Sequence, residues 1–328
     1  MKARLVDDPG GLRAGYVLAR GVGPLRKGTV LGEPELEALR RMSWRELSVV
    51  EMEPGEIHEE AAGRRLAMAA ARESIEATSF EEGSWRMTAE VRGIVEVDAA
   101  KLGEMNDSDD LAVVTLPDGQ VVVEHELVAR AKIVPFVIRE EELRRVERIG
   151  PAVRVRPFVP MRVAVLVQEQ LDDDALEKFR AALGVKVRFF GSDLISIERA
   201  GDIAAALKSC VARGAQVVAL IGSRLMDPLD PVMGALREAG ARLEKHGVPV
   251  NPGTLLWVAT LGDTGIIAAP GCAMLSRPTA FDVLLSRMLT GEKLTRQALA
   301  RLGAGGLLTK ETAFRLPPYG AGVPRGEP

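Results

Sequence analysis

The chain has 328 residues, of which 47% are hydrophobic and 27% are charged. This composition is ordinary for a globular protein and excludes a disordered or collagen-like chain, and the length predicts two domains of about 150 residues each. The charge is uneven, because residues 1–150 carry 21 basic and 29 acidic side chains, whereas residues 151–328 carry 22 and 17. The second domain is therefore the better suited to an anionic ligand.

Residue types exclude several further classes of function. The small positive excess of the second domain and the scarcity of aromatic residues (3 Trp, 2 Tyr and 8 Phe) argue against nucleic-acid binding. Cys210 and Cys272 are too few for a disulfide framework or a cysteine zinc site, and the three histidines are widely separated. The first residues lack an apolar signal core, and no apolar run approaches the roughly 20 residues of a membrane span. We therefore expect a cytoplasmic protein without membrane contact.

The first 150 residues alternate short apolar runs with three helical patterns, which indicates a strand-rich α+β domain. The expected strands are Tyr16–Ala19, Thr29–Leu31, Leu47–Val50, Glu90–Val97, Leu111–Leu116, Gln120–Val123 and Ala129–Ile138. The expected helices are Pro34–Met42, Glu56–Ser74 and Glu140–Ile149. Residues 151–160 contain three prolines and no periodicity, so we expect a linker there.

The second domain, expected over residues 161–312, alternates buried strands with helices. This pattern predicts a mostly parallel sheet with helices on both faces, a three-layer αβα fold. The expected strands are Val163–Val167, Val185–Phe190, Gln216–Ile221, Leu255–Leu261 and Ile266–Ala269. The expected helices are Asp172–Leu183, Asp202–Ala212, Pro231–His246, Ala280–Leu289 and Thr295–Leu302. Residues 313–328 are rich in Pro and Gly and are expected to be an unfolded tail.

Ligands of such folds bind at the carboxyl ends of the parallel strands. This rule directs attention to Gln168, to residues 222–230 and to residues 270–277. In residues 222–230, Asp227 and Asp230 are three residues apart and could hold Mg²⁺ beside a phosphate. They could equally cap the following helix, with Pro231 at its first position.

Two further loops lie in the same domain. Residues 247–253 form a rigid turn without charge that presents the amide of Asn251. Residues 269–278 lead from a strand through Pro270-Gly271 into a helix, and such a turn can offer free N–H groups to a phosphate, with Arg277 adding a charge. Cys272 could act as a nucleophile, but no histidine is near it in sequence, so a packing role is the simpler interpretation.

Taken together, these loops resemble the molybdopterin-binding domain of the MoaB, Mog and MoeA proteins. The matching segments are Ile221-Gly222-Ser223, Pro252-Gly253-Thr254 and Pro270-Gly271-Cys272. The first domain resembles the amino-terminal region of MoeA proteins through Lys27–Leu31 and Lys132–Phe136. The resemblance spans roughly residues 1–310. It implies a MoaB/Mog-like αβα domain with a mixed, mostly parallel sheet, preceded by a smaller α+β domain.

Three departures from the family pattern bear on activity. The usual double glycine is Ile221-Gly222, the usual asparagine is replaced by Cys272, and the usual lysine by Thr254. The absence of this lysine and asparagine argues against catalysis more strongly than it argues against binding.

The resemblance implies a protein of molybdenum cofactor biosynthesis that binds molybdopterin or its adenylylated form and assists Mg²⁺-dependent insertion of molybdate. The alternatives are a non-catalytic carrier or sensor of the cofactor and an assembly protein for a molybdoenzyme. Asp227 and Asp230 are the expected catalytic and Mg²⁺-binding residues. The expected ligand-binding residues are Gln168, Gly222, Ser223, Asn251, Pro252, Gly253, Pro270, Gly271, Cys272, Ser276 and Arg277. The relatives also imply a homo-oligomer.

Overall fold

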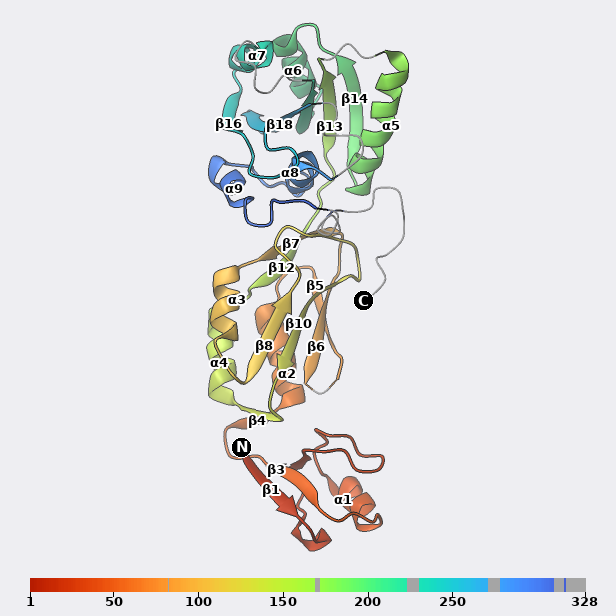
Figure 1. The fold of residues 1–328 in the computed structure, drawn as a ribbon, viewed down its shortest axis with the longest axis vertical. Helices are drawn as coiled ribbons and strands as arrows, with labels where there is room; N and C mark the ends of the chain where they lie inside the picture. The colour runs from red at the N-terminus through yellow and green to blue at the C-terminus, as the bar shows by residue number, and fades with distance from the viewer. Residues whose placement is uncertain (82, 169–171, 223–229, 271–277, 310–315, 317–328) are drawn as a thin grey trace. The chain divides into compact units, whose positions relative to one another are not determined.

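The chain forms two compact units in a computed structural model that describes residues 1–81, 83–168, 172–222, 230–270, 278–309 and 316 (Figure 1). Unit 1 contains residues 1–91, 95–118 and 123–155, and unit 2 contains residues 92–94, 119–122 and 156–328. None of the helices within the described residues combines the length and the apolar character that crossing a lipid bilayer requires.

The elements up to residue 157 are short strands and four helices. The strands are β1 (Lys2–Val6), β2 (Tyr16–Leu18), β3 (Leu47–Glu51), β4 (Glu56–His58), β5 (Ile75–Ser79), β6 (Ser84–Ala89), β7 (Gly93–Val97), β8 (Leu111–Thr115), β9 (Val121–Val122), β10 (Leu127–Ile133), β11 (Val137–Arg139) and β12 (Val153–Pro157). The helices are α1 (Glu33–Arg40), α2 (Glu59–Ala70), α3 (Ala99–Asn106) and α4 (Glu140–Ile149), with a 3₁₀ turn at Pro9–Gly11.

Unit 1 is built on a four-stranded antiparallel sheet in the order β5-β6-β10-β8, with α2 packed against it. Helix α2 begins after His58, whose Nδ1 accepts the N–H of Glu60 at 3.3 Å. Its apolar stripe of Ala62, Leu66 and Ala70 is buried, because residues three to four apart lie on one face of a helix. The helix is shorter at both ends than the sequence predicts.

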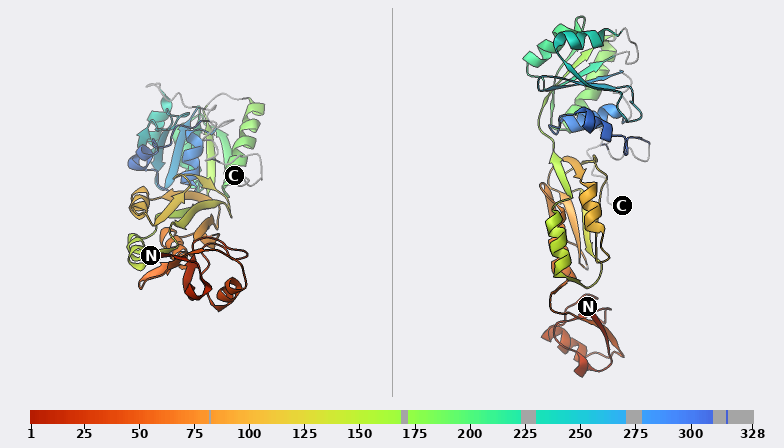
Figure 2. Two further views of the ribbon diagram at one scale, coloured as in Figure 1. Left: turned by 60° about the horizontal axis from the view of Figure 1, so that its bottom comes forward. Right: turned by 90° about the vertical axis from the view of Figure 1, so that its left-hand side faces the viewer.

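Unit 2 is built on a six-stranded sheet in the order β14-β13-β15-β18-β17-β16 (Figure 2). Its strands are β13 (Arg162–Val167), β14 (Asp193–Arg199), β15 (Val217–Ile221), β16 (Arg242–His246), β17 (Trp257–Leu261) and β18 (Thr264–Ala269). Its helices are α5 (Asp173–Phe189), α6 (Ile203–Ala212), α7 (Pro231–Ala239), α8 (Ala280–Met288) and α9 (Arg296–Arg301). The pairs β13–β14, β13–β15 and β15–β18 are parallel, and β16–β17 and β17–β18 are antiparallel.

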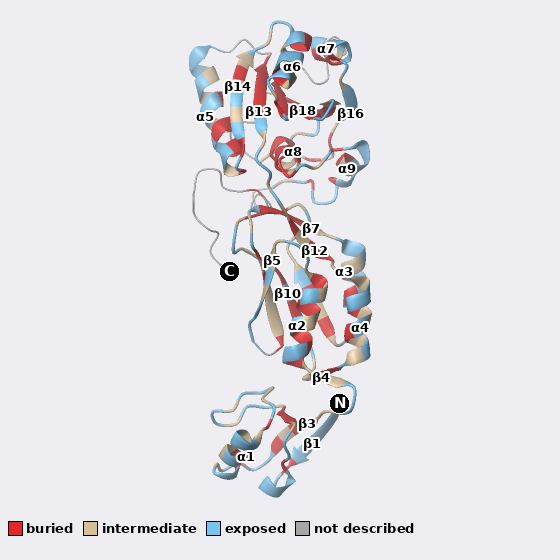
Figure 3. Cartoon of the chain, turned by 180° about the vertical axis from the view of Figure 1, so that it is seen from behind, coloured by how far each residue is buried: buried red, intermediate tan, exposed pale blue. Residues whose placement is uncertain are grey.

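The central strands of unit 2 are buried on both faces (Figure 3). Val163, Val165 and Val167 of β13 pack in one apolar cluster with side chains of α5 and α8, whereas Ala164 and Leu166 pack in another with side chains of α6 and α7. Alternate residues of a strand point to opposite faces, so the two clusters are the two sides of one sheet. The sheet therefore lies between two helical layers, and the predicted αβα fold with a mixed, mostly parallel sheet is confirmed.

Two of the predicted elements of unit 2 are wrong. Residues 185–190 were expected as a strand, but α5 continues to Phe189, and the neighbouring strand is β14. Leu183 and Val187 lie four residues apart in the apolar core, so packing along the helix outweighs the β-propensity of the local run. Residues 231–246 were expected as one helix, but Gly240 adopts φ +82 and ends α7, after which β16 begins.

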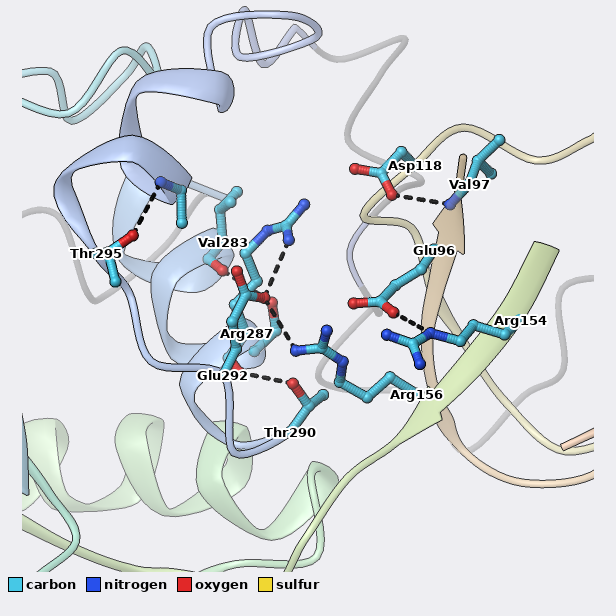
Figure 4. Close-up of polar contacts among 12 residues, drawn as sticks. Glu96, Val97, Asp118, Arg154, Arg156, Val283, Arg287, Thr290, Glu292 and Thr295 are labelled. Atoms are coloured by element: carbon cyan, nitrogen blue, oxygen red, sulfur yellow. Dashed lines mark hydrogen bonds and ion pairs between the residues drawn. The ribbon is translucent and has the colours of Figure 1, made fainter. Parts of the chain in front are cut away.

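Two short segments that precede residue 150 belong to unit 2. Ile94 and Val121 are part of the same apolar cluster as α8. Gly119 adopts φ +80, and a Cβ added there would lie 2.8 Å from Nη2 of Arg287. Arg287 in turn pairs with Glu292 at 3.1 Å, and Glu292 also lies 3.6 Å from Arg156 (Figure 4). Unit 2 is therefore assembled from three separate stretches of sequence.

Candidate functional site

Three adjacent parallel strands of unit 2 end at the same level. The N–H of Gln168 donates to the carbonyl of Ile221 at 2.8 Å, and the N–H of Gly222 donates to the carbonyl of Ala269 at 3.0 Å. Gln168, Gly222 and Pro270 are therefore the first residues beyond the ends of β13, β15 and β18. Neighbouring strands lie about 4.8 Å apart, so these residues form one continuous row, which we call the carboxyl edge.

The side chain of Gln168 carries the unusual polar group of this edge. Its Oε1 is buried and has no hydrogen-bond partner among the residues that the structure describes. A buried polar atom without a partner costs free energy, and nearly all such atoms in native proteins are satisfied. A ligand that donates an N–H or O–H to this oxygen would remove that cost.

Gly222 lies at the centre of the carboxyl edge, and it has no side chain to cover the backbone there. It adopts φ +94, a conformation that residues with a Cβ rarely occupy. The absence of a side chain lets a ligand approach the main chain directly. The positive φ and the space that a ligand needs therefore both explain why a glycine occupies this position.

Asp230 is the cap of helix α7. Its Oδ1 accepts the N–H of Val232 at 2.8 Å, and the residue is 5% exposed. Pro231 follows at the first helical position, where its missing N–H costs nothing. This geometry is that of the capping alternative, so at least one carboxylate oxygen of Asp230 is committed to the fold.

The loop that contains Asn251, Pro252 and Gly253 is anchored on both sides. The backbone of Asn251 accepts from Leu308 and donates to Gly306, each at 2.8 Å. Gly253 adopts φ +112, and a Cβ added there would lie 2.7 Å from Cβ of Ala280. The loop is thus held in one position, while Asn251 itself is exposed and leaves its side chain accessible.

Helix α8 begins beneath this loop. The N–H of Ala280 donates to the carbonyl of Pro252 at 2.8 Å, and the N–H of Phe281 donates to Oγ1 of Thr279 at 3.2 Å. The N–H of Asp282 donates to the carbonyl of Thr279 at 3.0 Å. These three N–H groups are therefore already used within the protein, whereas the amides of Gly271 and Cys272, which are predicted to bind a phosphate, lie outside the described residues.

A buried ion pair joins helix α5 to the first turn of α8. Lys186 of α5 places Nζ 2.7 Å from Oδ1 of Asp282, and the two residues are 5% and 0% exposed. The other carboxylate oxygen accepts the N–H of Thr279 at 2.8 Å. No local sequence pattern indicates this pair, although Thr279 and Asp282 have the spacing of a capping box before an apolar run.

Six of the predicted site residues lie outside the described residues: Ser223, Asp227, Gly271, Cys272, Ser276 and Arg277. Their roles stay predictions. Within the ranges that the structure describes, no group of three or more His, Cys, Asp or Glu side chains is arranged to hold a metal ion. The described part of the site therefore contributes Gln168, Gly222, Asn251, Pro252, Gly253 and Pro270, together with the helix cap Asp230.

The other cysteine, Cys210, is remote in sequence from these loops and lies in the opposite helical layer, on α6. Burial raises the pKa of its thiol, and Sγ lies 3.3 Å from Nη2 of Arg213. A thiol that stays protonated is a poor nucleophile, so we expect no catalytic role for Cys210. The residue is part of the apolar core.

Comparison with solved structures gives matches to molybdopterin biosynthesis proteins. MoaB of Thermus thermophilus is 17% identical over 40% of this chain and 98% of its own length, with a TM-score of 0.29. A MoeA protein of Pyrococcus horikoshii is 15% identical over 76% of this chain and 81% of its own, with a TM-score of 0.31. A MogA structure is 16% identical over 43% of this chain and 98% of its own, with a TM-score of 0.26.

These are the proteins that the sequence resembles, but the TM-scores are low, and the sheet order and layers of the chain itself define its fold. No family model and no curated protein matches the sequence.

Proposed function

We propose that residues 161–312 form a domain that binds molybdopterin or its adenylylated form, and that the chain acts in molybdenum cofactor biosynthesis in the cytoplasm. The observation that carries the proposal is the carboxyl edge, where Gln168, Gly222 and Pro270 are aligned and one buried acceptor has no partner within the described part of the chain. A pterin ring presents amide and amine N–H groups that suit such an acceptor. The family resemblance of the loops supports the choice of ligand.

The described edge offers hydrogen-bond acceptors and small residues. Gln168 and Asn251 would orient the polar edge of the pterin, and Gly222 would let the ring approach the backbone. The phosphate would be bound by residues 223–229 and 271–277, where Ser223, Ser276 and Arg277 supply donors in the sequence. We assign the phosphate to these segments because the first N–H groups of α8 already donate hydrogen bonds within the protein.

A non-catalytic carrier or sensor of the cofactor is the second candidate, and Asp230 favours it. Oδ1 of Asp230 already caps α7, a structural role that explains the residue without a metal ion. The magnesium site at Asp227 and Asp230, and molybdate insertion with it, therefore stay predictions. Incubation with adenylylated molybdopterin and molybdate separates the candidates, since an enzyme releases AMP and a carrier does not.

The binding proposal is tested with the full chain purified without oxygen. After oxidation, the fluorescence of released pterin reports bound cofactor, and titration with a phosphorylated pterin gives the affinity. Gln168→Leu should weaken binding about tenfold, the value of one or two hydrogen bonds, without lowering stability, because it removes an unsatisfied acceptor.

The matched control is Gln216→Leu. Gln216 lies at the other end of β15, and its Oε1 accepts the N–H of Arg162 at 3.1 Å. This variant should bind like the wild type. Absence of pterin from the purified protein together with no binding in the titration would refute the proposal, and equal affinity of the two variants would refute the role of Gln168.

A further inference from the structure

The ion pair between Lys186 and Asp282 joins two helices on one face of the unit 2 sheet. Both residues are at least 95% buried, and their charged atoms are 2.7 Å apart. Nζ of Lys186 also lies 5.9 Å from the centre of the Phe281 ring. Two charges lose their hydration in such a place, and an apolar pair of similar volume is often as stable or more stable. Stability alone is thus a weak reason for this pair.

The carboxylate of Asp282 connects Lys186 to the start of α8. One oxygen binds Nζ of Lys186, and the other accepts the N–H of Thr279. Thr279 is the cap of α8. Lys186 is therefore joined, through Asp282, to the residue at which α8 begins.

The loop of residues 251–253 contacts the same first turn of α8. The carbonyl of Pro252 accepts the N–H of Ala280, and Gly253 lies directly against Ala280. The segment 251–253 is thus anchored on the first turn of α8. The ion pair ties that turn to α5.

We infer that Lys186 is a positioning residue of the ligand site, which holds the first turn of α8, and through it the loop of residues 251–253, in the geometry that binds a phosphorylated pterin. This inference rests on the proposed function. A loop that is already ordered loses less conformational entropy on binding, so the pair contributes to affinity through the position of this loop. A charged pair fixes orientation in a way that an apolar contact does not, because its hydrogen bond is directional.

The test replaces both charges at once, because removal of one partner would leave a buried charge and destabilise the protein. In Lys186→Met/Asp282→Asn, the Asn oxygen still accepts the N–H of Thr279. The full chain should keep its unfolding midpoint, while amide hydrogen exchange rises in residues 278–282. Affinity for a phosphorylated pterin should fall about tenfold.

A second variant adds a rescue. Lys186→Gln/Asp282→Asn restores a neutral pair that can form a hydrogen bond, so its affinity should recover toward the wild type. A merely structural pair would alter stability and affinity together or leave both unchanged, and it would show no such recovery. The control is Arg145→Met/Glu142→Gln, which removes an ion pair in unit 1 and should leave binding unchanged.

Wild-type affinity and wild-type exchange in Lys186→Met/Asp282→Asn would overturn the inference. Failure of the proposed function is a separate result, because the wild-type chain itself would then not bind the phosphorylated pterin. The exchange measurement still decides in that case whether the pair holds the first turn of α8.

Discussion

Replacement of Gly253 by Ala should destabilise unit 2 by an amount that can be worked out from its surroundings. The residue adopts φ +112, and a Cβ there would lie 2.7 Å from Cβ and 2.9 Å from the backbone N of Ala280. A non-glycine residue in such a conformation costs about 1–3 kcal/mol, and forcing apart two packed backbones costs a further 1–3 kcal/mol. We therefore expect a loss of about 3 kcal/mol in the free energy of unfolding.

The matched control is Gly262→Ala. Gly262 also has a positive φ, +60, but no atom lies within 4 Å of the added Cβ. This variant carries the backbone cost alone, about 1 kcal/mol. The difference of about 2 kcal/mol between the two variants measures the contact between Gly253 and Ala280.

Urea unfolding followed by the fluorescence of Trp257 provides the assay. Trp257 is 1% exposed and lies in β17, so it reports on unit 2. Trp44 and Trp85 lie in unit 1 and are replaced by Phe in the background used. If Gly253→Ala is no less stable than Gly262→Ala, the loop does not rest on α8, and the anchoring of residues 251–253 on the first turn of that helix fails with it.

Three further outcomes are expected. Asp230→Ala should lower the stability of unit 2 by about 1 kcal/mol in urea unfolding, and Asp230→Asn should restore most of it, because Asn also caps a helix. In a Cys272→Ser background, Cys210 should react with a thiol reagent only after denaturant is added, since burial raises the pKa of its thiol; rapid reaction in native buffer would contradict this. The hydrogen bond from Arg145 lowers the pKa of Glu142, so its stabilisation is present above the unfolded value of about 4.3 and is lost as the pH falls through the folded value. The stability difference between the wild type and Glu142→Gln should therefore shrink below about pH 4.

The strands that carry the site could be predicted from the sequence because their signal is local. Buried parallel strands are continuous apolar runs, and β13, β15 and β18 all have this pattern. Since ligands of such sheets bind at the carboxyl ends, Gln168, Gly222 and Pro270 could be selected without coordinates. The structure places all three in one row. Their contact with a ligand stays a prediction.

The parts that failed depend on contacts far apart in sequence. Residues 185–190 have a β-branched local pattern, and only the packing of α5 on the sheet makes them helical. Lys186 and Asp282 are separated by 96 positions, and no local pattern pairs them. The engagement of the Ala280 N–H likewise depends on Pro252, which the fold brings to it from another loop.

The carboxyl edge and the loops beyond it would recognise different groups of the ligand. The edge suits N–H groups, and the loops suit the phosphate. The described side-chain atom that lacks a partner at the carboxyl edge is an acceptor, Oε1 of Gln168, and the first N–H groups of α8 are used within the fold. An acceptor favours the N–H groups of a heterocycle and repels a phosphate, because like partial charges face each other. The phosphate of the proposed ligand therefore depends on donors outside this edge, and in the sequence these are the hydroxyls of Ser223 and Ser276 and the guanidinium of Arg277. Removal of such a donor should matter for a phosphorylated pterin and not for its dephosphorylated form, whereas removal of Gln168 should weaken both equally.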